Sequence, residues 1–191
     1  MSVKVEQSGK GRAFRWRVAG WGLAAFLLLL PFLAMQVSDE VAWSGGDFVL
    51  VALMLGIAGG AVELAARISG NRYFRGGALV AIVACFLLVI VNLAVGFLGD
   101  EGNPANLMFA GVIAVAIGGA IVAHFRAAGM ARAMVAAAAA QALAAVVGLA
   151  AGWASPGYDG IREVILGTGL FGGLFLLSAF LFVKAASEDQ A

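Results

Sequence analysis

The chain has 191 residues, of which 63% are hydrophobic and only 12% charged, and its mean hydropathy is +1.00. A soluble domain carries about 25% charged residues, so this composition excludes a soluble protein and predicts an integral membrane protein. The formal net charge of +1 excludes a strongly basic surface, so no nucleic-acid partner is expected.

The N-terminal segment is basic and precedes an apolar run that covers residues 18–37. Its cations are Lys4, Lys10, Arg12, Arg15 and Arg17. A signal peptide has the same order of basic and apolar residues, but this run reaches spanning length and no A-x-A cleavage site follows it. We therefore predict that residues 1–17 form a basic cytoplasmic segment and that the first span is retained.

Apolar runs of about 20 residues recur along the whole chain, and each is long enough to cross about 30 Å of hydrocarbon as a helix. They cover residues 18–37, 47–66, 78–98, 105–125, 133–153 and 164–183. The runs are continuous rather than alternating, which favours helices over the strands of a barrel. The sequence thus predicts an all-α membrane protein: one six-helix transmembrane domain over residues 18–184 and a cytoplasmic tail at 185–191.

The charges between the runs predict the orientation of the chain. If the N-terminus is cytoplasmic, eleven of the twelve Lys and Arg residues fall on the cytoplasmic side and only Arg162 falls outside. The outer segments then hold carboxylates: Asp39, Glu40, Asp100, Glu101, Asp159 and Glu163. Lys and Arg are enriched in the cytoplasmic loops of membrane proteins, so we expect both termini in the cytoplasm.

Three loops carry residues that are typical of helix starts. The segment Ser44-Gly-Gly-Asp47 has the spacing of a capping box, and Asn103-Pro104 places a capping amide before a proline at the first helical position. We expect Ser155-Pro156 to Asp159 to do similar work before the sixth span.

Small residues in the spans predict close helix packing, because lipid provides no hydrophobic drive for helix association. The GxxxG pairs are Gly56 and Gly60, Gly148 and Gly152, and Gly169 and Gly173. Packing within one bundle and packing in a homo-oligomer or against a partner protein both explain them, and a glycine-lined pore is the alternative.

Ionisable residues within spans are costly in lipid and are candidates for function. Glu63 follows Gly56 and Gly60 on one helix face and precedes Arg67 by one turn. One interpretation is an ion pair between Glu63 and Arg67 or Arg126. The other is a protonatable carboxylate on an ion path, with His124 as a proton relay.

Two amides interrupt other spans on faces of small residues. Asn92 shares a face with Cys85, Gly96 and Gly99, and Gln141 interrupts the alanine-rich fifth run. Hydrogen bonds between helices explain such amides, and solvation of a permeating solute is the alternative. The candidate polar path therefore consists of Glu63, Asn92, His124, Arg126 and Gln141.

The outer turn with Asp100 and Glu101 supplies oxygen atoms that could hold a divalent cation, although its spacing does not match an EF-hand loop. We expect it to act as surface charge. On the cytoplasmic side Arg67, Arg72 and Arg75 are candidates for contact with anionic lipid headgroups.

Motifs of catalysis and cofactor binding are missing from the sequence. One histidine and one cysteine exclude most His/Cys metal sites, and no GxSxG, Walker A, HExxH or CxxC motif occurs. We predict no catalytic, cofactor-binding or metal-binding residues, and no cofactor.

The stretch from Asn92 to Met108 (NLAVGFLGDEGNPANLM), with Phe125 to Arg132 and Gln141 to Leu143, resembles a group of small bacterial polytopic inner-membrane proteins. The resemblance covers roughly residues 45–150. It implies the same helical architecture and a multi-pass location in the bacterial inner membrane, and it brings no activity or binding residue to this chain.

The sequence favours a non-catalytic protein of the inner membrane, an interaction or accessory subunit. The alternative is a small ion or solute transporter or channel that uses the candidate polar path. An integral membrane enzyme is the third class, and it would need a reactive cluster that the sequence does not show.

Overall fold

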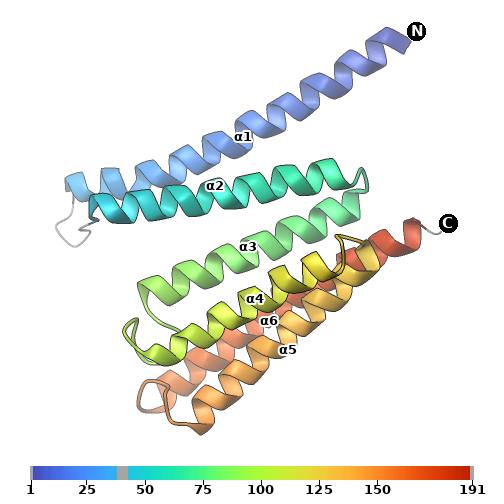
Figure 1. The fold of residues 1–191 in the computed structure, drawn as a ribbon. Helices are drawn as coiled ribbons and strands as arrows, with labels where there is room; N and C mark the ends of the chain where they lie inside the picture. The colour runs from blue at the N-terminus through green and yellow to red at the C-terminus, as the bar shows by residue number, and fades with distance from the viewer. Residues whose placement is uncertain (1, 38–42, 190–191) are drawn as a thin grey trace. The chain divides into compact units, whose positions relative to one another are not determined.

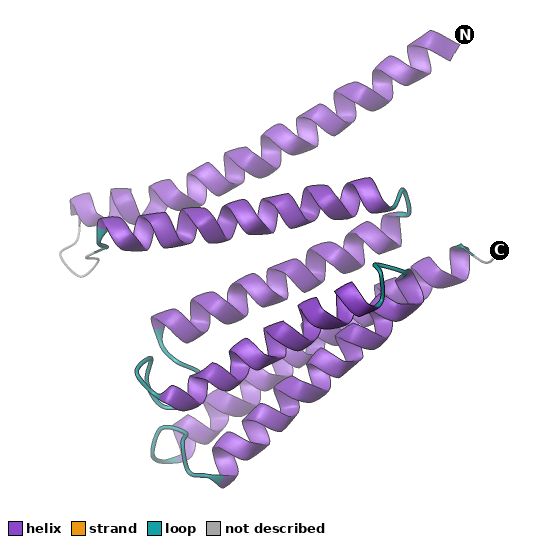
Figure 2. Cartoon of the chain, in the orientation of Figure 1, coloured by secondary structure: helices purple, strands orange, loops and turns teal. Residues whose placement is uncertain are grey.

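The computed structural model describes the backbone of residues 2–37 and 43–189, with their side chains except those of residues 2–16 and 158. In these residues all regular secondary structure is helical (Figure 1 and Figure 2). Six helices are long and apolar enough to cross a membrane. This confirms the predicted all-α fold with six candidate spans.

The elements are α1 (Ser2–Val37), α2 (Gly45–Ile68), α3 (Arg72–Ala94), the 3-10 helix η1 (Pro104–Asn106), α4 (Leu107–Val122), α5 (Ala127–Ala150) and α6 (Tyr158–Glu188). The third helix starts and ends earlier than its apolar run at 78–98. It starts earlier because the Asn71 side chain accepts hydrogen bonds from the amides of Tyr73 and Phe74. It ends earlier because Gly96 takes a positive φ of 74° in the loop that follows.

The chain divides into two compact units, residues 1–61 and 62–191, and α2 passes from the first to the second. In the first unit α2 begins with the predicted capping box. Ser44 donates from N–H and Oγ to Asp47 Oδ2 at 2.7 and 2.8 Å, and the amide of Asp47 donates to Ser44 Oγ at 3.3 Å. Trp21 of α1 packs at Gly59, where an added Cβ would lie 3.2 Å from Trp21 Cη2.

The second unit is built on α5 and α6. Helix α5 packs against both α4 and α6, and α3 packs against α6 (Figure 1). Alanine lines the buried faces of α3, α4 and α5, and α6 contributes large rings to the same core. These buried rings are Phe171, Phe175 and Phe182. Small faces let the helix backbones approach closely, and the phenylalanines fill the space that remains.

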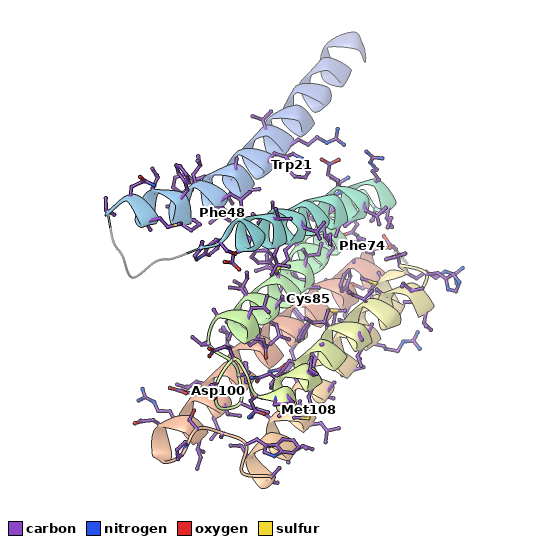
Figure 3. The ribbon with its side chains drawn as sticks, turned by 60° about the vertical axis from the view of Figure 1, so that its left-hand side comes forward. Trp21, Phe48, Phe74, Cys85, Asp100 and Met108 are labelled. Atoms are coloured by element: carbon purple, nitrogen blue, oxygen red, sulfur yellow. The ribbon has the colours of Figure 1, made fainter. Side chains whose placement is uncertain are left out.

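The second unit has two ends, because its successive helices run in opposite directions. We call one the loop end; it carries the α3–α4 loop (95–103) and the α5–α6 loop (151–157). We call the other the turn end; it carries the α2–α3 turn, the α4–α5 turn and the end of α6. In Figure 3, Phe74 marks the turn end of α3, Cys85 its middle and Asp100 the loop end.

Contacts at the turn end fix α3 on α6. The rings of Phe74 and Phe182 meet edge to face at a centroid distance of 5.2 Å. One turn further into the core, the buried Ser178 hydroxyl donates to the carbonyl of Gly77 at 2.7 Å. Gly77 leaves room for this approach, since an added Cβ would lie 3.2 Å from the ring of Phe182.

Candidate functional site

Asn106 organises the loop end. Its buried side chain accepts hydrogen bonds from the amides of Phe97 at 2.9 Å and Leu98 at 2.8 Å. It donates from Nδ2 to the carbonyl of Asp100 at 2.7 Å. One side-chain amide thus bonds two buried N–H groups and one carbonyl of the loop, whose backbone groups have no partners within a helix.

The α3–α4 loop is also tied to the α5–α6 loop. Asn103 caps η1 by accepting from the amide of Ala105 at 3.0 Å, as the sequence predicts, and it donates to the carbonyl of Trp153 at 3.2 Å. The Ser155 hydroxyl donates across to the carbonyl of Gly99 at 3.3 Å. The expected cap by Ser155 is therefore wrong: α6 follows Gly157 without a side-chain cap, because Ser155 binds the other loop.

Phe97 and Leu98, which we call the plug, insert from this loop into the core. Leu98 is fully buried and fills the place of a side chain at Gly148, where an added Cβ would lie 2.5 Å from either Cδ of Leu98. The Phe97 ring packs on Phe109 at a centroid distance of 4.4 Å and on Phe171 at 5.8 Å. Gly148 therefore serves packing within the chain, one of the roles that its GxxxG spacing predicts.

Three polar side chains of the second unit carry buried atoms without a hydrogen-bond partner in the described chain. Gln141 is fully buried, and neither Oε1 nor Nε2 is bonded. Asn92 donates to the carbonyl of Leu88 at 2.7 Å, but its Oδ1 is unbonded. Thr168 Oγ1 is the third group. Asn92 and Gln141 of the candidate polar path therefore do not bind each other.

The remaining path residues lie at the turn end, where Arg67 Nη2 is 3.7 Å from Glu63 Oε2. This geometry matches the ion-pair interpretation of Glu63, which is itself 28% exposed. His124 and Arg126 are exposed in the α4–α5 turn, and His124 Nδ1 lies 3.0 Å from the carbonyl of Val122. The structure thus places the charged path residues at the helix ends and the two amides inside the bundle.

The three arginines proposed to contact lipid differ in their partners. Arg75 donates from Nε to the carbonyl of Ser69 at 2.7 Å and from Nη2 to that of Ala66 at 2.8 Å, so it caps the end of α2. Arg72 lies over the Tyr73 ring at 4.7 Å and 3.9 Å from Glu188. The Arg67 and Arg72 side chains are 73% and 78% exposed.

Asp100 and Glu101 lie in an exposed turn. Among the described residues no group of three or more His, Cys, Asp or Glu side chains is placed to hold a metal ion. Asp39 and Glu40, and the side chains of Lys4, Lys10, Arg12 and Arg15, lie outside the described part of the chain.

Sequence reasoning missed the roles of Asn106, Thr168 and Ser178. In the sequence Asn106 is one more amide that follows the outer turn. Its distance along the chain from Phe97 and Leu98 matches no known motif. Thr168 and Ser178 look like small interface residues among glycine and leucine. Whether they lie beside Gly77 or beside the plug depends on how α6 packs on its neighbours. The sequence pattern of one helix does not show this.

No family model matches this chain, and no curated protein and no solved structure matches it either. The resemblance of Asn92–Met108 to small bacterial inner-membrane proteins stays a prediction.

Proposed function

We propose that the chain is a non-catalytic, multi-pass subunit of the bacterial inner membrane that binds another membrane protein through the glycine face of α6. The observation that carries the proposal is the open space at Gly169 and Gly173. Both are exposed, and a Cβ added at either would meet nothing within 4 Å. By contrast, Gly167 on the opposite side of α6 is filled by the Phe97 ring.

The glycine face has the composition of a helix–helix interface in lipid. Gly169 and Gly173 are one turn apart, and exposed Leu166, Leu170 and Leu177 flank them. Glycine exposes the backbone to close van der Waals contact, which is the main attraction between helices in hydrocarbon. If this face contacted only lipid, replacing each glycine by alanine would stabilise the helix by about 0.8–1.0 kcal/mol.

The orientation and the lipid contacts belong to the same proposal. With both termini in the cytoplasm, the turn end faces the cytoplasm and brings Arg67, Arg72 and Lys184 to that surface. Arg67 and Arg72 are 73% and 78% exposed, which supports contact with anionic headgroups. Arg75 contributes less, since its guanidinium already binds two carbonyls.

The test is photo-crosslinking in native membranes with a benzophenone amino acid at Leu170, on the glycine face. Leu79 on α3, which is 48% exposed against 58% for Leu170, is the matched position for background. We expect one defined membrane protein to crosslink at Leu170 and not at Leu79. Gly173→Leu should abolish the product. Gly111→Leu on α4, where an added side chain also meets open space, should leave it intact. Crosslinks only between copies of this chain, or only to lipid, would contradict an accessory role.

A transporter remains the second candidate function, because unpartnered Asn92 and Gln141 atoms lie inside the bundle. Proton and cation flux into proteoliposomes tests it. Under this proposal wild type conducts, and Glu63→Gln loses flux while it stays folded. Absence of flux in wild type across several ions, with insertion verified, would argue against transport.

A further inference from the structure

The loop-end half of the second unit contains buried polar atoms that have no hydrogen-bond partner among the described residues. The Gln141 side chain can make four hydrogen bonds and makes none in the described chain, although it is fully buried. The Thr168 hydroxyl is also buried and unbonded. In a membrane no bulk solvent reaches such groups, so each costs free energy unless something binds it.

The two groups occupy the same end of the bundle and both face its interior. Gln141 is two turns, about 10.5 Å, further into α5 than Gly148, which packs on Leu98 of the plug. A spacing of seven residues places three buried positions on one face of α5: Met134, Gln141 and Gly148. Thr168 follows Gly167, which packs on the Phe97 ring, and lies on the buried α6 face between Val164 and Phe171. Along α5, Gln141 therefore lies further from the loop end than Leu98, and on α6 Thr168 lies next to the residue that packs on Phe97.

The chemistry of the surroundings selects the ligand. The buried polar residues of the described chain are Asn106, Gln141 and Ser178, which are all neutral. Asn106 and Ser178 are already bonded to backbone groups. A neutral site among closely packed alanines and phenylalanines suits a small neutral molecule with both donors and acceptors, and offers nothing to neutralise an ion.

We propose that Gln141 and Thr168 form an internal water-binding site beneath the plug, with Asn92 Oδ1 as a further acceptor on α3. Buried waters in proteins make about three hydrogen bonds to polar groups that lack other partners. Water donates to Gln141 Oε1 and accepts from Nε2, and the Thr168 hydroxyl serves in either sense. This site does not depend on the partner proposed for α6, because the glycine face lies on the other side of that helix.

Solid-state NMR of the full chain in lipid vesicles tests the proposal directly. Gln7, Gln36, Gln141 and Gln190 are the glutamines to be labelled with ¹⁵N in the side chain. We expect polarisation transfer from water to Gln141 Nε2, with hydrogen exchange into D₂O far slower than at exposed Gln36. The signal is assigned by its loss in Gln141→Met. If that variant does not fold, replacing the other three glutamines leaves Gln141 as the single signal. A Gln141 signal that receives polarisation only from protein and lipid protons would overturn the proposal.

Thermal stability supplies a second readout, with opposite signs for the two outcomes. If water is bound, Gln141→Met lowers Tm, and adding Thr168→Val lowers it by less than the sum of the single effects, since both residues hold the same water. If the core is dry, Gln141→Met removes an unpaired polar group and raises Tm. Gln36→Met, at an exposed position of α1, is the matched control and should leave Tm unchanged.

Discussion

Replacing Asn106 by alanine should destabilise the protein strongly. The substitution leaves the buried amides of Phe97 and Leu98 without an acceptor. Each buried unpaired group costs about 1–3 kcal/mol, so we expect a loss of about 2–6 kcal/mol. The carbonyl of Asp100 also loses its 2.7 Å donor, but it lies in an exposed turn where water replaces Nδ2. At roughly 2–4 °C per kcal/mol for a chain of this size, Tm should fall by about 4 °C or more.

The assay is thermal unfolding in detergent, followed by reaction of a fluorescent maleimide with Cys85, the only cysteine of the chain. Two variants grade the effect. Asn106→Asp keeps the acceptor and loses the donor, so it should fall between wild type and Asn106→Ala. Asn103→Ala removes a more exposed amide and should cost about 0.5–1.5 kcal/mol. Equal losses of stability for Asn103→Ala and Asn106→Ala would show that water reaches the amides of Phe97 and Leu98. That result would refute this reasoning.

Three further substitutions test the packing of the second unit by the same assay. His124→Gly should raise stability by up to about 1 kcal/mol. His124 has a φ of 47°, and glycine adopts this conformation without strain. A decrease in stability would point to a structural role for the imidazole. Gly119→Ala should cost about 1–3 kcal/mol, since its Cβ would lie 2.6 Å from Ala133 Cβ and only movement of a backbone relieves this; Gly111→Ala, in open space, is its control. Ser178→Ala should cost about 1 kcal/mol through the lost bond to Gly77, and Ser187→Ala at the exposed end of α6 should cost nothing measurable.

Much of the fold could be predicted from the sequence because the bilayer constrains each helix separately. A run such as 47–66 must span as a helix whatever its neighbours are, and Ser44 with Asp47 caps that helix through contacts within four residues. Local rules fail where a residue is used by a distant segment. Ser155 has the sequence pattern of a cap and binds Gly99 instead, across 56 positions of the chain.

The candidate site divides in the same way. The spacing of Glu63 and Arg67 is enough to predict their pairing, since residues four apart share a helix face. The plug could not be predicted, because Phe97 and Leu98 continue an apolar run that reads as the end of the third span. Only the folded loop, held by Asn106, shows that they leave the helix and enter the core. That Gln141 lacks a partner in the described residues likewise depends on α4 and α6, which pack on α5.

The central place of α5 has a consequence for how the protein enters the membrane. Its middle, residues 136–140, is five consecutive alanines, and Gln141 follows them. Alanine and glutamine contribute little to partition from the translocon into lipid, so we expect α5 on its own to partition weakly. Yet it has the largest buried share of the six spans, and its strongest packing is with α6. We therefore expect α5 and α6 to enter the bilayer together, as a hairpin. A nascent chain cut after residue 157 should leave α5 accessible to water-soluble reagents, and extension through residue 189 should protect it.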